Sequence, residues 1–252
     1  MIQAERIKAI LELLNEQGSV SVDDLASRLD VSPMTIRRDL DSCDKEGLLT
    51  RCHGGAFIRK ASITEVPYSD KSLRNIDEKK RIAERCAMLV KPNDTVYLDA
   101  GTTCLEVARK IVDIPGIRVT TNDLTIALYL STHDIEVYVP GGIIQKSTKS
   151  VLGESVTKTI QQMNFTVSFI GTASISNSWE VMTPTMEKMY LKRMIIERSE
   201  HSYVVADASK FHHQAMYRIE HLSKVSGLVT TYEFSISEME NIHREGIYII
   251  EA

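Results

Sequence analysis

The stretch Asp99-Ala100-Gly101-Thr102-Thr103 combines groups that can bind an anion. The glycine lets a ligand approach the backbone, the threonine hydroxyls donate hydrogen bonds, and a helix that begins there offers free N–H groups. Together these groups have the chemistry of a phosphate cradle. Taken alone, however, such a stretch is more typical of an ordinary strand-to-helix turn.

Three other segments have side chains of a similar kind: Thr121-Asn122-Asp123, Pro140-Gly141-Gly142 and Asp207-Ala208-Ser209-Lys210. Singly, Asn122 and Asp123 can be a helix cap, Gly141 and Gly142 a turn, and Lys210 a solvated surface charge. With the first stretch, they supply hydroxyls, carboxylates and one cation. That set suits a small phosphorylated polyol.

Each of the four segments follows a short, β-branched apolar run that predicts a strand. Helical patterns such as 105–111 and 186–196 lie between several of these runs, and this alternation favours a mostly parallel sheet covered on both faces. Ligands bind at the carboxyl ends of the strands in such sheets, so we expect the four segments to share one edge. The predicted strands are 95–98, 118–120, 135–139, 166–170, 202–206, 228–230 and 247–250.

A second kind of chemistry lies in Ser32-Pro33-Met34-Thr35-Ile36-Arg37-Arg38-Asp39-Leu40. Ser32 predicts a helix cap, and Pro33 suits the first helical position. At 100° per residue, Ile36, Leu40 and Cys43 share an inner face. The outer side then carries Met34, Thr35, Arg37, Arg38, Asp41 and Lys45. Arginines near the start of a helix are placed to meet base edges and phosphates in a DNA major groove, although the pair can also be a solvated face.

Two more helices and a hairpin are predicted around this one. Ile7, Ile10, Leu11 and Leu14 recur at helical spacing before Gly18, and Ser21 with Asp24 resembles a capping box. The segment 47–60 predicts a hairpin that turns at His53-Gly54-Gly55. It would place Arg51, His53, Arg59 and Lys60 near backbone phosphates, as the wing of a winged helix-turn-helix does.

Bulk properties set limits on these interpretations. The 252 residues carry a net charge of −4, and residues 1–57 contain seven Lys and Arg against ten Asp and Glu. DNA binding would therefore depend on a local patch. An apolar run of membrane-spanning length and a signal peptide are both lacking, so we expect a cytoplasmic protein. The spacing of Cys43, Cys52, Cys86 and Cys104 suits neither zinc nor a disulfide framework, and no metal or cofactor is expected.

The sequence also resembles a known family. Residues 3–58 are similar to the helix-turn-helix of the DeoR family of bacterial repressors, through the 32–40 segment and then Gly47, Leu48, Arg51, His53, Gly54 and Gly55. Residues 77–230 resemble the effector domain of the same family, whose fold is similar to ribose-5-phosphate isomerase. The elements Asp-Ala-Gly-Thr-Thr, Thr-Asn-Asp, Gly-Gly and Asp-Ala-Ser-Lys-Phe match in order.

The resemblance implies roles for particular residues. Thr102, Thr103 and Lys210 would contact the phosphate of a sugar phosphate, while Asp99, Asn122 and Asp123 would lie towards the sugar. On the DNA side, we expect Arg38 to read bases and Arg37 to anchor to a phosphate or base, although the two roles can be exchanged. Asp39 is expected to be a structural partner within the helical unit.

An enzyme with the isomerase activity is the alternative, but the chain departs from that pattern. The predicted strand 166–170 leads into Gly171-Thr172-Ala173-Ser174 without an acid, and Lys192 falls where the isomerases carry a catalytic glutamate, so no catalytic residue is expected. Glu187, one turn earlier, is a possible substitute base or a solvated surface carboxylate. Trp179 can close over a ligand or pack against another subunit.

These observations predict an α/β protein with an N-terminal winged helix-turn-helix and a Rossmann-like, mostly parallel effector domain. The expected boundaries are 1–58 for the DNA-binding domain, 59–76 for a linker and 77–252 for the sugar-phosphate sensor. We expect a repressor of carbohydrate uptake or catabolism genes that binds double-stranded operator DNA as a homodimer or homotetramer. A winged helix that binds protein instead of DNA is the other alternative.

Overall fold

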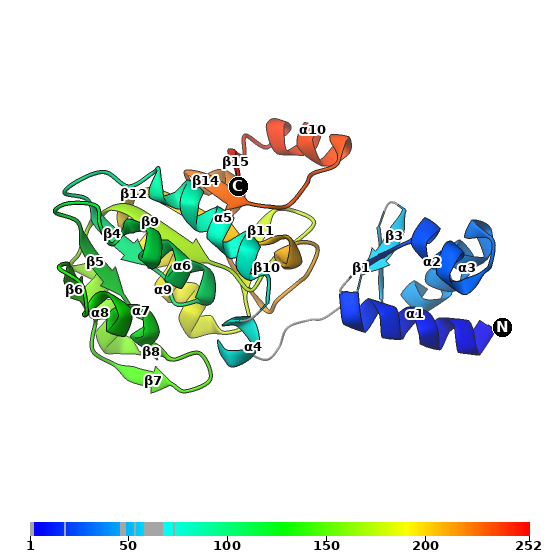
Figure 1. Ribbon diagram of the computed structural model, residues 1–252, viewed down its shortest axis with the longest axis horizontal. Coiled ribbons are helices and arrows are strands. Elements are labelled where there is room, and N and C mark those ends of the chain that lie inside the picture. Colours follow the sequence, from blue (N-terminus) through cyan, green and yellow to red (C-terminus); the bar gives the residue numbers. More distant parts are fainter. Residues whose placement is uncertain (1–2, 18, 46–48, 53, 58–67, 73) are drawn as a thin grey trace. The chain divides into compact units, whose positions relative to one another are not determined.

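The computed structural model describes residues 3–17, 19–45, 49–52, 54–57, 68–72 and 74–252. They form two compact units (Figure 1). The first comprises residues up to 61 together with 212–214, and the second comprises the rest of the chain. The predicted residues Gly47, Leu48, His53, Arg59 and Lys60, and most of the predicted linker, lie outside the described residues.

The first unit consists of three helices and a small antiparallel sheet. The helices are α1 (Gln3–Gln17), α2 (Val22–Leu29) and α3 (Pro33–Lys45), and the strands are β1 (Ser19–Ser21), β2 (Thr50–Cys52) and β3 (Gly55–Phe57). The strand order is β1-β3-β2, so β3 pairs with both neighbours. The predicted hairpin of the wing is confirmed, and β1 adds a third strand that sequence patterns do not indicate.

Local sequence signals place the helix starts where they were expected. The Ser21 hydroxyl accepts a hydrogen bond from the Asp24 N–H at the start of α2, and Ser32 accepts one from the Thr35 N–H before α3. These caps satisfy N–H groups that the helix itself cannot satisfy. The predicted inner face of α3 is confirmed, because Ile36, Leu40 and Cys43 are fully buried in one core. The other members of that core include Ile10, Leu14, Val22, Leu25 and Leu49.

A buried ion pair fastens α3 to α1. The Asp39 carboxylate, only 2% exposed, accepts hydrogen bonds from Arg6 Nε at 2.5 Å and from Gln3 Nε2 at 3.2 Å. The expected structural role of Asp39 is thereby confirmed. Because a buried carboxylate is costly without a partner, this contact is compatible only with the orientation of α3 that its apolar face also favours.

The second unit contains a seven-stranded sheet in which every neighbouring pair is parallel. Its order is β15-β14-β12-β9-β4-β5-β6. The strands are β4 (Thr95–Leu98), β5 (Arg118–Thr121), β6 (Glu136–Tyr138), β9 (Phe165–Gly171), β12 (Ser199–Ala206), β14 (Gly227–Thr230) and β15 (Ile249–Glu251). All seven predicted runs became strands, and the mostly parallel α/β architecture is confirmed.

Helices cover both faces of this sheet (Figure 1). On one face, α5 (Ile76–Ala87), α6 (Thr102–Ile111) and α7 (Leu124–Leu130) enclose a core that includes Val96, Leu98 and Phe169. On the other, α8 (Glu154–Gln161) and α9 (Met186–Glu197) pack over Tyr97 and Ile170. Successive residues of β4 thus point into different cores, as the pleat of a strand requires.

Smaller elements surround the main sheet. One antiparallel hairpin joins β7 (Ile143–Gln145) to β8 (Ser150–Leu152), and a second small sheet contains β10 (Ser174–Ile175), β11 (Glu180–Thr183) and β13 (Tyr217–His221). The remaining elements are α4 (Tyr68–Ser72), the 3-10 turns η1 (Ala208–Lys210) and η2 (Leu222–Lys224), and α10 (Ile236–Arg244). Within the described ranges, no helix combines the length and apolar composition needed to cross a membrane.

The two faces of α3 should differ sharply in their effect on stability. We expect Leu40→Ala to lower the free energy of unfolding by about 2–5 kcal/mol, because it leaves a cavity in a fully buried site. Arg38→Ala, on the exposed side of the same helix, should change it by no more than about 0.5 kcal/mol. Urea unfolding followed by circular dichroism measures both. Equal losses would contradict the assignment of the two faces.

Candidate functional site

The exposed side of α3 carries the residues that were predicted to meet DNA. Met34 is 57% exposed, and Arg37 and Arg38 are also exposed. The Ser32 and Thr35 hydroxyls lie 2.9 Å apart at the start of the helix. This surface therefore offers two guanidinium groups, two hydroxyls and a flexible thioether around one helix N-terminus.

The first unit has a negative net charge, but ion pairs occupy some of its carboxylates and leave positive charge on the exposed side of α3. Asp24 pairs with Arg28, and Asp39 pairs with Arg6. Among the described residues, no carboxylate is paired with Arg37 or Arg38. These two guanidinium groups are therefore available to a polyanion, which fits a local patch on a chain of net negative charge.

Arg51 lies on the wing in a more constrained position than expected. Its Nε contacts Asp41 Oδ1 at 2.9 Å, and its guanidinium donates to the Gly55 carbonyl at 3.3 Å. The side chain thus ties β2 to both α3 and β3. A DNA contact from Arg51 stays a prediction, and His53 lies outside the described residues.

The main sheet reverses its strand order between β4 and β9. The chain runs from β4 through β5 to β6 in one direction, and from β9 through β12 and β14 to β15 in the other. Connections leave such a switch point towards opposite faces, which is where ligands bind in open α/β sheets. We use "switch point" for the carboxyl ends of β4 and β9 and the residues that directly follow them.

Asp99 occupies the centre of the switch point. Its Oδ2 accepts a hydrogen bond from the Gly171 N–H at 2.9 Å and pairs with the ammonium group of Lys192, which also donates to the Gly171 carbonyl at 2.6 Å. Asp99 and Lys192 are 2% and 7% exposed. A charge pair this well buried needs such additional hydrogen bonds. Asp99 is therefore held in a fixed orientation.

The N-terminus of α6 lies beside Asp99. The helix begins at Thr102, and its first backbone bond runs from the Leu105 N–H to the Gly101 carbonyl at 3.0 Å. The N–H groups of the first turn therefore have no acceptor within the helix. In this first turn, Thr102 is buried and Thr103 is half-buried. This is the geometry that the predicted phosphate cradle requires.

Asp123 and Asn122 have structural roles in addition to the predicted ones. Asp123 caps α7 through the N–H groups of Thr125 and Ile126, and it accepts the Gly101 N–H at 3.1 Å. Burial raises the pKa of its carboxyl, and these backbone hydrogen bonds only partly offset that effect. Asn122 accepts the Tyr97 hydroxyl at 2.9 Å and donates to the Val151 carbonyl at 3.2 Å. Both residues link the β5 end to its neighbours.

The other predicted loops are located further out along the edge. Gly141 and Gly142 follow β6, and a Cβ on Gly142 would lie 2.5 Å from the Leu152 carbonyl oxygen, so the close approach to β8 requires glycine there. Lys210 follows β12, with β9 between that strand and β4. Burial alone would raise the pKa of Asp207, but the charge of Lys210 and hydrogen bonds from Ser209 and Asn75 lower it overall.

Two lysines of α9 were not among the predicted site residues. Lys192 pairs with Asp99, and Lys188, one turn earlier, donates to the Thr148 hydroxyl at 3.3 Å. Both are nearly buried, although lysine is rarely so. The sequence did contain a signal for this burial, because Lys188 and Lys192 share one helical face with the fully buried Ile195.

Trp179 and Glu187 take neither of the special roles considered for them. Trp179 is 4% exposed within a core that also holds Phe211 and Phe234, and its indole N–H donates to Asn241. Its side chain therefore packs inside its own unit. Glu187 is exposed on α9, as expected for a solvated surface carboxylate.

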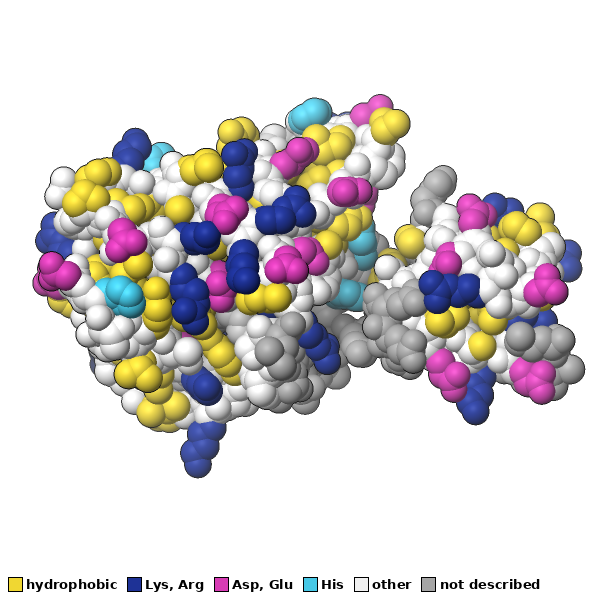
Figure 2. Space-filling model, viewed as in Figure 1, with side chains coloured by type: hydrophobic (Ala, Val, Ile, Leu, Met, Phe, Trp, Pro, Cys, Tyr) yellow, Lys and Arg dark blue, Asp and Glu magenta, His cyan; other side chains and the backbone are white. Residues whose placement is uncertain are grey.

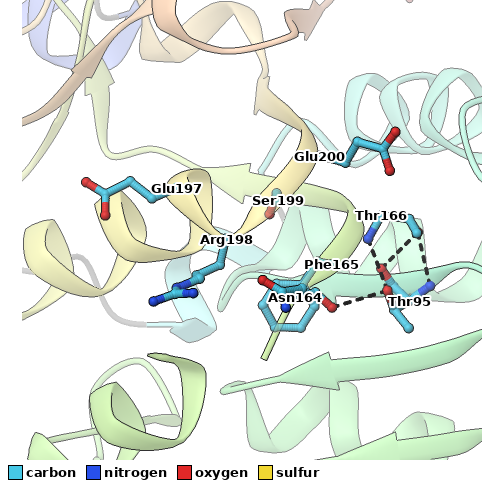
Figure 3. Close-up of a pocket in the computed structure, with 8 residues that line it drawn as sticks. All are labelled: Thr95, Asn164, Phe165, Thr166, Glu197, Arg198, Ser199 and Glu200. Atoms are coloured by element: carbon cyan, nitrogen blue, oxygen red, sulfur yellow. Dashed lines mark hydrogen bonds between the residues drawn. The ribbon is translucent and has the colours of Figure 1, made fainter. Parts of the chain in front are cut away.

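A separate pocket opens at the opposite, amino-terminal edge of the sheet (Figure 3). Figure 3 shows Thr95 and Thr166 bonded to one another, each hydroxyl meeting the backbone of the other residue. The Thr95 hydroxyl also donates to the Asn164 carbonyl at 3.3 Å. These hydroxyls already have partners, and ligands favour the carboxyl edge of such sheets, so the switch point is the stronger candidate site.

Comparison with solved structures gives a distant match to the second unit. Ribose 5-phosphate isomerase A from Methanocaldococcus jannaschii aligns with a TM-score of 0.41 and 12% identity, over 54% of this chain and 55% of that one. A structure of ribose-5-phosphate isomerase in complex with phospho-erythronic acid aligns with a TM-score of 0.40 and 14% identity, over 53% and 52%. Likeness at this level says nothing about activity.

Characterised relatives match over almost the whole length. The glycerol-3-phosphate regulon repressor of Escherichia coli K12 is 32% identical, covering 95% of both chains. The lactose phosphotransferase system repressor of Streptococcus mutans is 33% identical, covering 91% of this chain and 92% of its own. The HTH-type transcriptional regulator GlpR of Haloferax volcanii is 30% identical, over 100% and 98%.

Two family models cover the chain in the same order as its units. Residues 6–61 match the DeoR-like helix-turn-helix domain, and residues 74–232 match the DeoR C-terminal sensor domain. The exposed arginines of α3 lie in the first range, and the switch point lies in the second. The chain therefore belongs to the DeoR family of DNA-binding transcription regulators, which are not enzymes.

Proposed function

We propose that this protein represses genes for carbohydrate uptake or catabolism, under the control of a phosphorylated sugar or sugar derivative. The ligand would bind at the switch point of the second unit, and operator DNA would bind the exposed side of α3. The protein would act in the cytoplasm as a homodimer or homotetramer. Residues 1–58 would serve DNA binding, 59–76 would connect the parts, and 77–252 would serve sensing.

The observation that carries this proposal is the arrangement around Asp99. A fixed carboxylate, a helix N-terminus and the Thr102 and Thr103 hydroxyls occur together where two strand connections diverge. A carboxylate suits sugar hydroxyls, and free N–H groups with threonine hydroxyls suit a phosphate. The names of the relatives support the same ligand class, because one represses a glycerol-3-phosphate regulon and another a lactose phosphotransferase system.

The DNA half of the proposal rests on α3. Its guanidinium groups are exposed in the N-terminal half of the helix, and Leu40 and Asp39 anchor the opposite side. Figure 2 shows that the visible face of the second unit mixes Lys and Arg with Asp and Glu, without a broad field of one sign. That mixture suits recognition by a small patch more than general attraction to DNA.

Substitution of the two arginines should separate base reading from phosphate anchoring. We expect Arg38→Ala to weaken operator binding by about 1–3 kcal/mol and to relax sequence preference. Arg37→Ala should weaken binding to all sequences and reduce the slope of affinity against salt by about one. Fluorescence anisotropy at several salt concentrations measures both effects. If neither variant alters DNA binding while both stay folded, α3 is not the recognition helix.

A screen of melting temperatures should identify the effector class. At about 100 times its dissociation constant, a ligand adds about 2.7 kcal/mol to stability, or roughly 5–10 °C for a unit of this size. Glycerol 3-phosphate and a panel of pentose and hexose phosphates would each be compared with the unphosphorylated compound. We expect a shift from one phosphorylated compound only, and no shift from any would reject a sugar-phosphate effector.

Two variants then locate the phosphate, because its predicted contacts lie on different sides of β9. Thr103→Val removes a hydroxyl from the α6 N-terminus, whereas Lys210→Ala removes the cation that follows β12. We expect both to reduce the shift, while Lys146→Ala, at an exposed lysine for which no ligand contact is predicted, leaves it unchanged. Loss in only one variant would assign the phosphate to that side. Arg38→Ala should keep the full shift.

The Asp99–Lys192 pair should behave as one unit. Lys192→Met strands a buried carboxylate, and we expect it to lower the free energy of unfolding by roughly 3–5 kcal/mol. The double variant Asp99→Asn/Lys192→Met should recover most of that loss, yet still fail to bind the effector. Urea unfolding and the melting screen measure the two effects. Additive losses in the double variant would show that the two charges do not depend on each other.

A further inference from the structure

The turn between β7 and β8, residues 146–149, contacts the end of β5, beside the switch point, on one side and α4 on the other. We call it the β7–β8 turn. It belongs to a two-stranded hairpin that lies outside the main sheet. No predicted site residue lies in it, so its contacts need another explanation.

On one side, the β7–β8 turn and the start of β8 are bonded to the end of β5. The Lys149 carbonyl accepts the Leu124 N–H at 3.0 Å, and the Val151 N–H donates to the Asn122 carbonyl at 2.7 Å. The Asn122 side chain returns a bond to the Val151 carbonyl at 3.2 Å. Asp123 and Ser150 also form an isolated β-bridge. A change at Asn122 or Asp123 must therefore shift or strain these bonds.

Side chains strengthen this side of the contact. The Thr148 and Ser150 hydroxyls lie 2.8 Å apart, and both residues are buried. Thr148 also accepts the ammonium of Lys188 at 3.3 Å. Since Lys188 is one helical turn from Lys192, the turn and the charge pair at Asp99 are set by the same helix, α9.

On its other side, the β7–β8 turn holds Tyr68. The Ser147 carbonyl accepts the Tyr68 N–H at 2.9 Å, and the Lys149 ammonium lies 4.9 Å from the centre of the Tyr68 ring. The ring is buried. Burial, followed by the negative charge of Asp123, raises the pKa of Tyr68 to about 12.

Tyr68 is the first residue of α4, and residues 58–67 before it lead back to the winged unit in sequence. The far end of α4 is also fixed. The ammonium of Lys79 in α5, buried at 4% exposure, donates to the carbonyls of Lys71 and Arg74 at 2.5 and 2.6 Å. One end of α4 is thus bound to α5. At its other end, Tyr68 contacts the β7–β8 turn, and its ring packs in the core that α5, α6 and α7 enclose.

We propose that the β7–β8 turn transmits ligand binding from the switch point to α4, and thereby to the segment that leads to the DNA-binding unit. This inference rests on the proposed function for its ligand, but the contacts of the β7–β8 turn are observed directly in the structure. A ligand can change DNA affinity only through a difference between two states. Here that difference is whether Asn122 and Asp123 hold the turn, and hence Tyr68, in the position described.

The test uses the intact chain with Lys149→Met and the matched control Lys146→Met. Both variants lose one exposed positive charge from the same turn, but only Lys149 contacts Tyr68. Methionine, like lysine, has a Cβ and a long unbranched side chain. It should therefore fit the left-handed backbone at residue 149 as well as lysine does. Three quantities are measured: hydrogen exchange of the Tyr68 amide, affinity for a DNA fragment selected from a random pool with and without the compound found in the melting screen, and the melting shift that this compound produces.

We expect Lys149→Met to speed exchange of the Tyr68 amide roughly two- to five-fold, as loss of an exposed cation–π contact implies. The effect of the compound on DNA affinity should fall by a similar factor, while the melting shift it produces is kept. Lys146→Met should match the unaltered protein in all three measurements. A full effect of the compound on DNA affinity in Lys149→Met would overturn the proposal.

If no compound binds, the proposed function fails and the exchange measurement still decides this inference. Asn122→Ala removes the side-chain bond to Val151 and should speed Tyr68 exchange in the ligand-free protein. The Leu228 amide, bonded to the Tyr248 carbonyl at the far side of the sheet, reports any general loosening. Faster exchange at Tyr68 with unchanged exchange at Leu228 supports transmission through the turn. Unchanged exchange at Tyr68, or an equal rise at both amides, overturns it.

Discussion

The buried charge pair between Asp99 and Lys192 is the contact on which the sensing half of the molecule depends. It joins the end of β4 to α9 at the place where the strand order of the sheet reverses. The Gly171 backbone completes the hydrogen bonds of the pair. Removal of either charge would leave the other without compensation in a dry interior. The orientation of α9 follows from this pair, and with it the position of Lys188 and of the hairpin that Lys188 contacts.

The same principle organises the winged unit on a smaller scale. There, Arg6 and Asp39 join α1 to α3 across more than thirty residues of chain. The pair lies on the side of α3 that Ile36, Leu40 and Cys43 already bury, so Arg37 and Arg38 remain outside. In both units, a buried carboxylate is paired with a cation from another element, an arginine of α1 in one case and a lysine of α9 in the other.

Elements with strong local signals could be predicted from the sequence. Ser32-Pro33 and the spacing of Ile36, Leu40 and Cys43 predicted α3 and its inner face, and β-branched runs predicted every strand of the main sheet. The three-residue strands β1, β7 and β8 were missed because they are too short to show alternation and depend on distant partners. The Asp99–Lys192 contact was missed for a related reason, since 93 positions separate its residues.

Of the candidate site, the residues beside the strand ends could be named and a helix cap could be given as one alternative, but the task of each side chain could not be assigned. Asn122 and Asp123 were chosen as polar groups for a sugar, and in the structure they also cap α7 and hold Val151. A side chain that does both cannot be recognised from its type and position alone. Lys188 was overlooked because a lysine is assumed to be solvated unless its helical neighbours are examined.

The internal pairing of charges in the winged unit has a consequence for how the protein would search a genome. Arg6, Arg28 and Arg51 are committed to Asp39, Asp24 and Asp41, which leaves few cations to attract a phosphate backbone. Attraction to arbitrary sequences comes almost entirely from such cations, and a genome offers an immense excess of arbitrary sites. A protein built in this way would leave wrong sites quickly, so that few copies per cell suffice to keep one operator occupied.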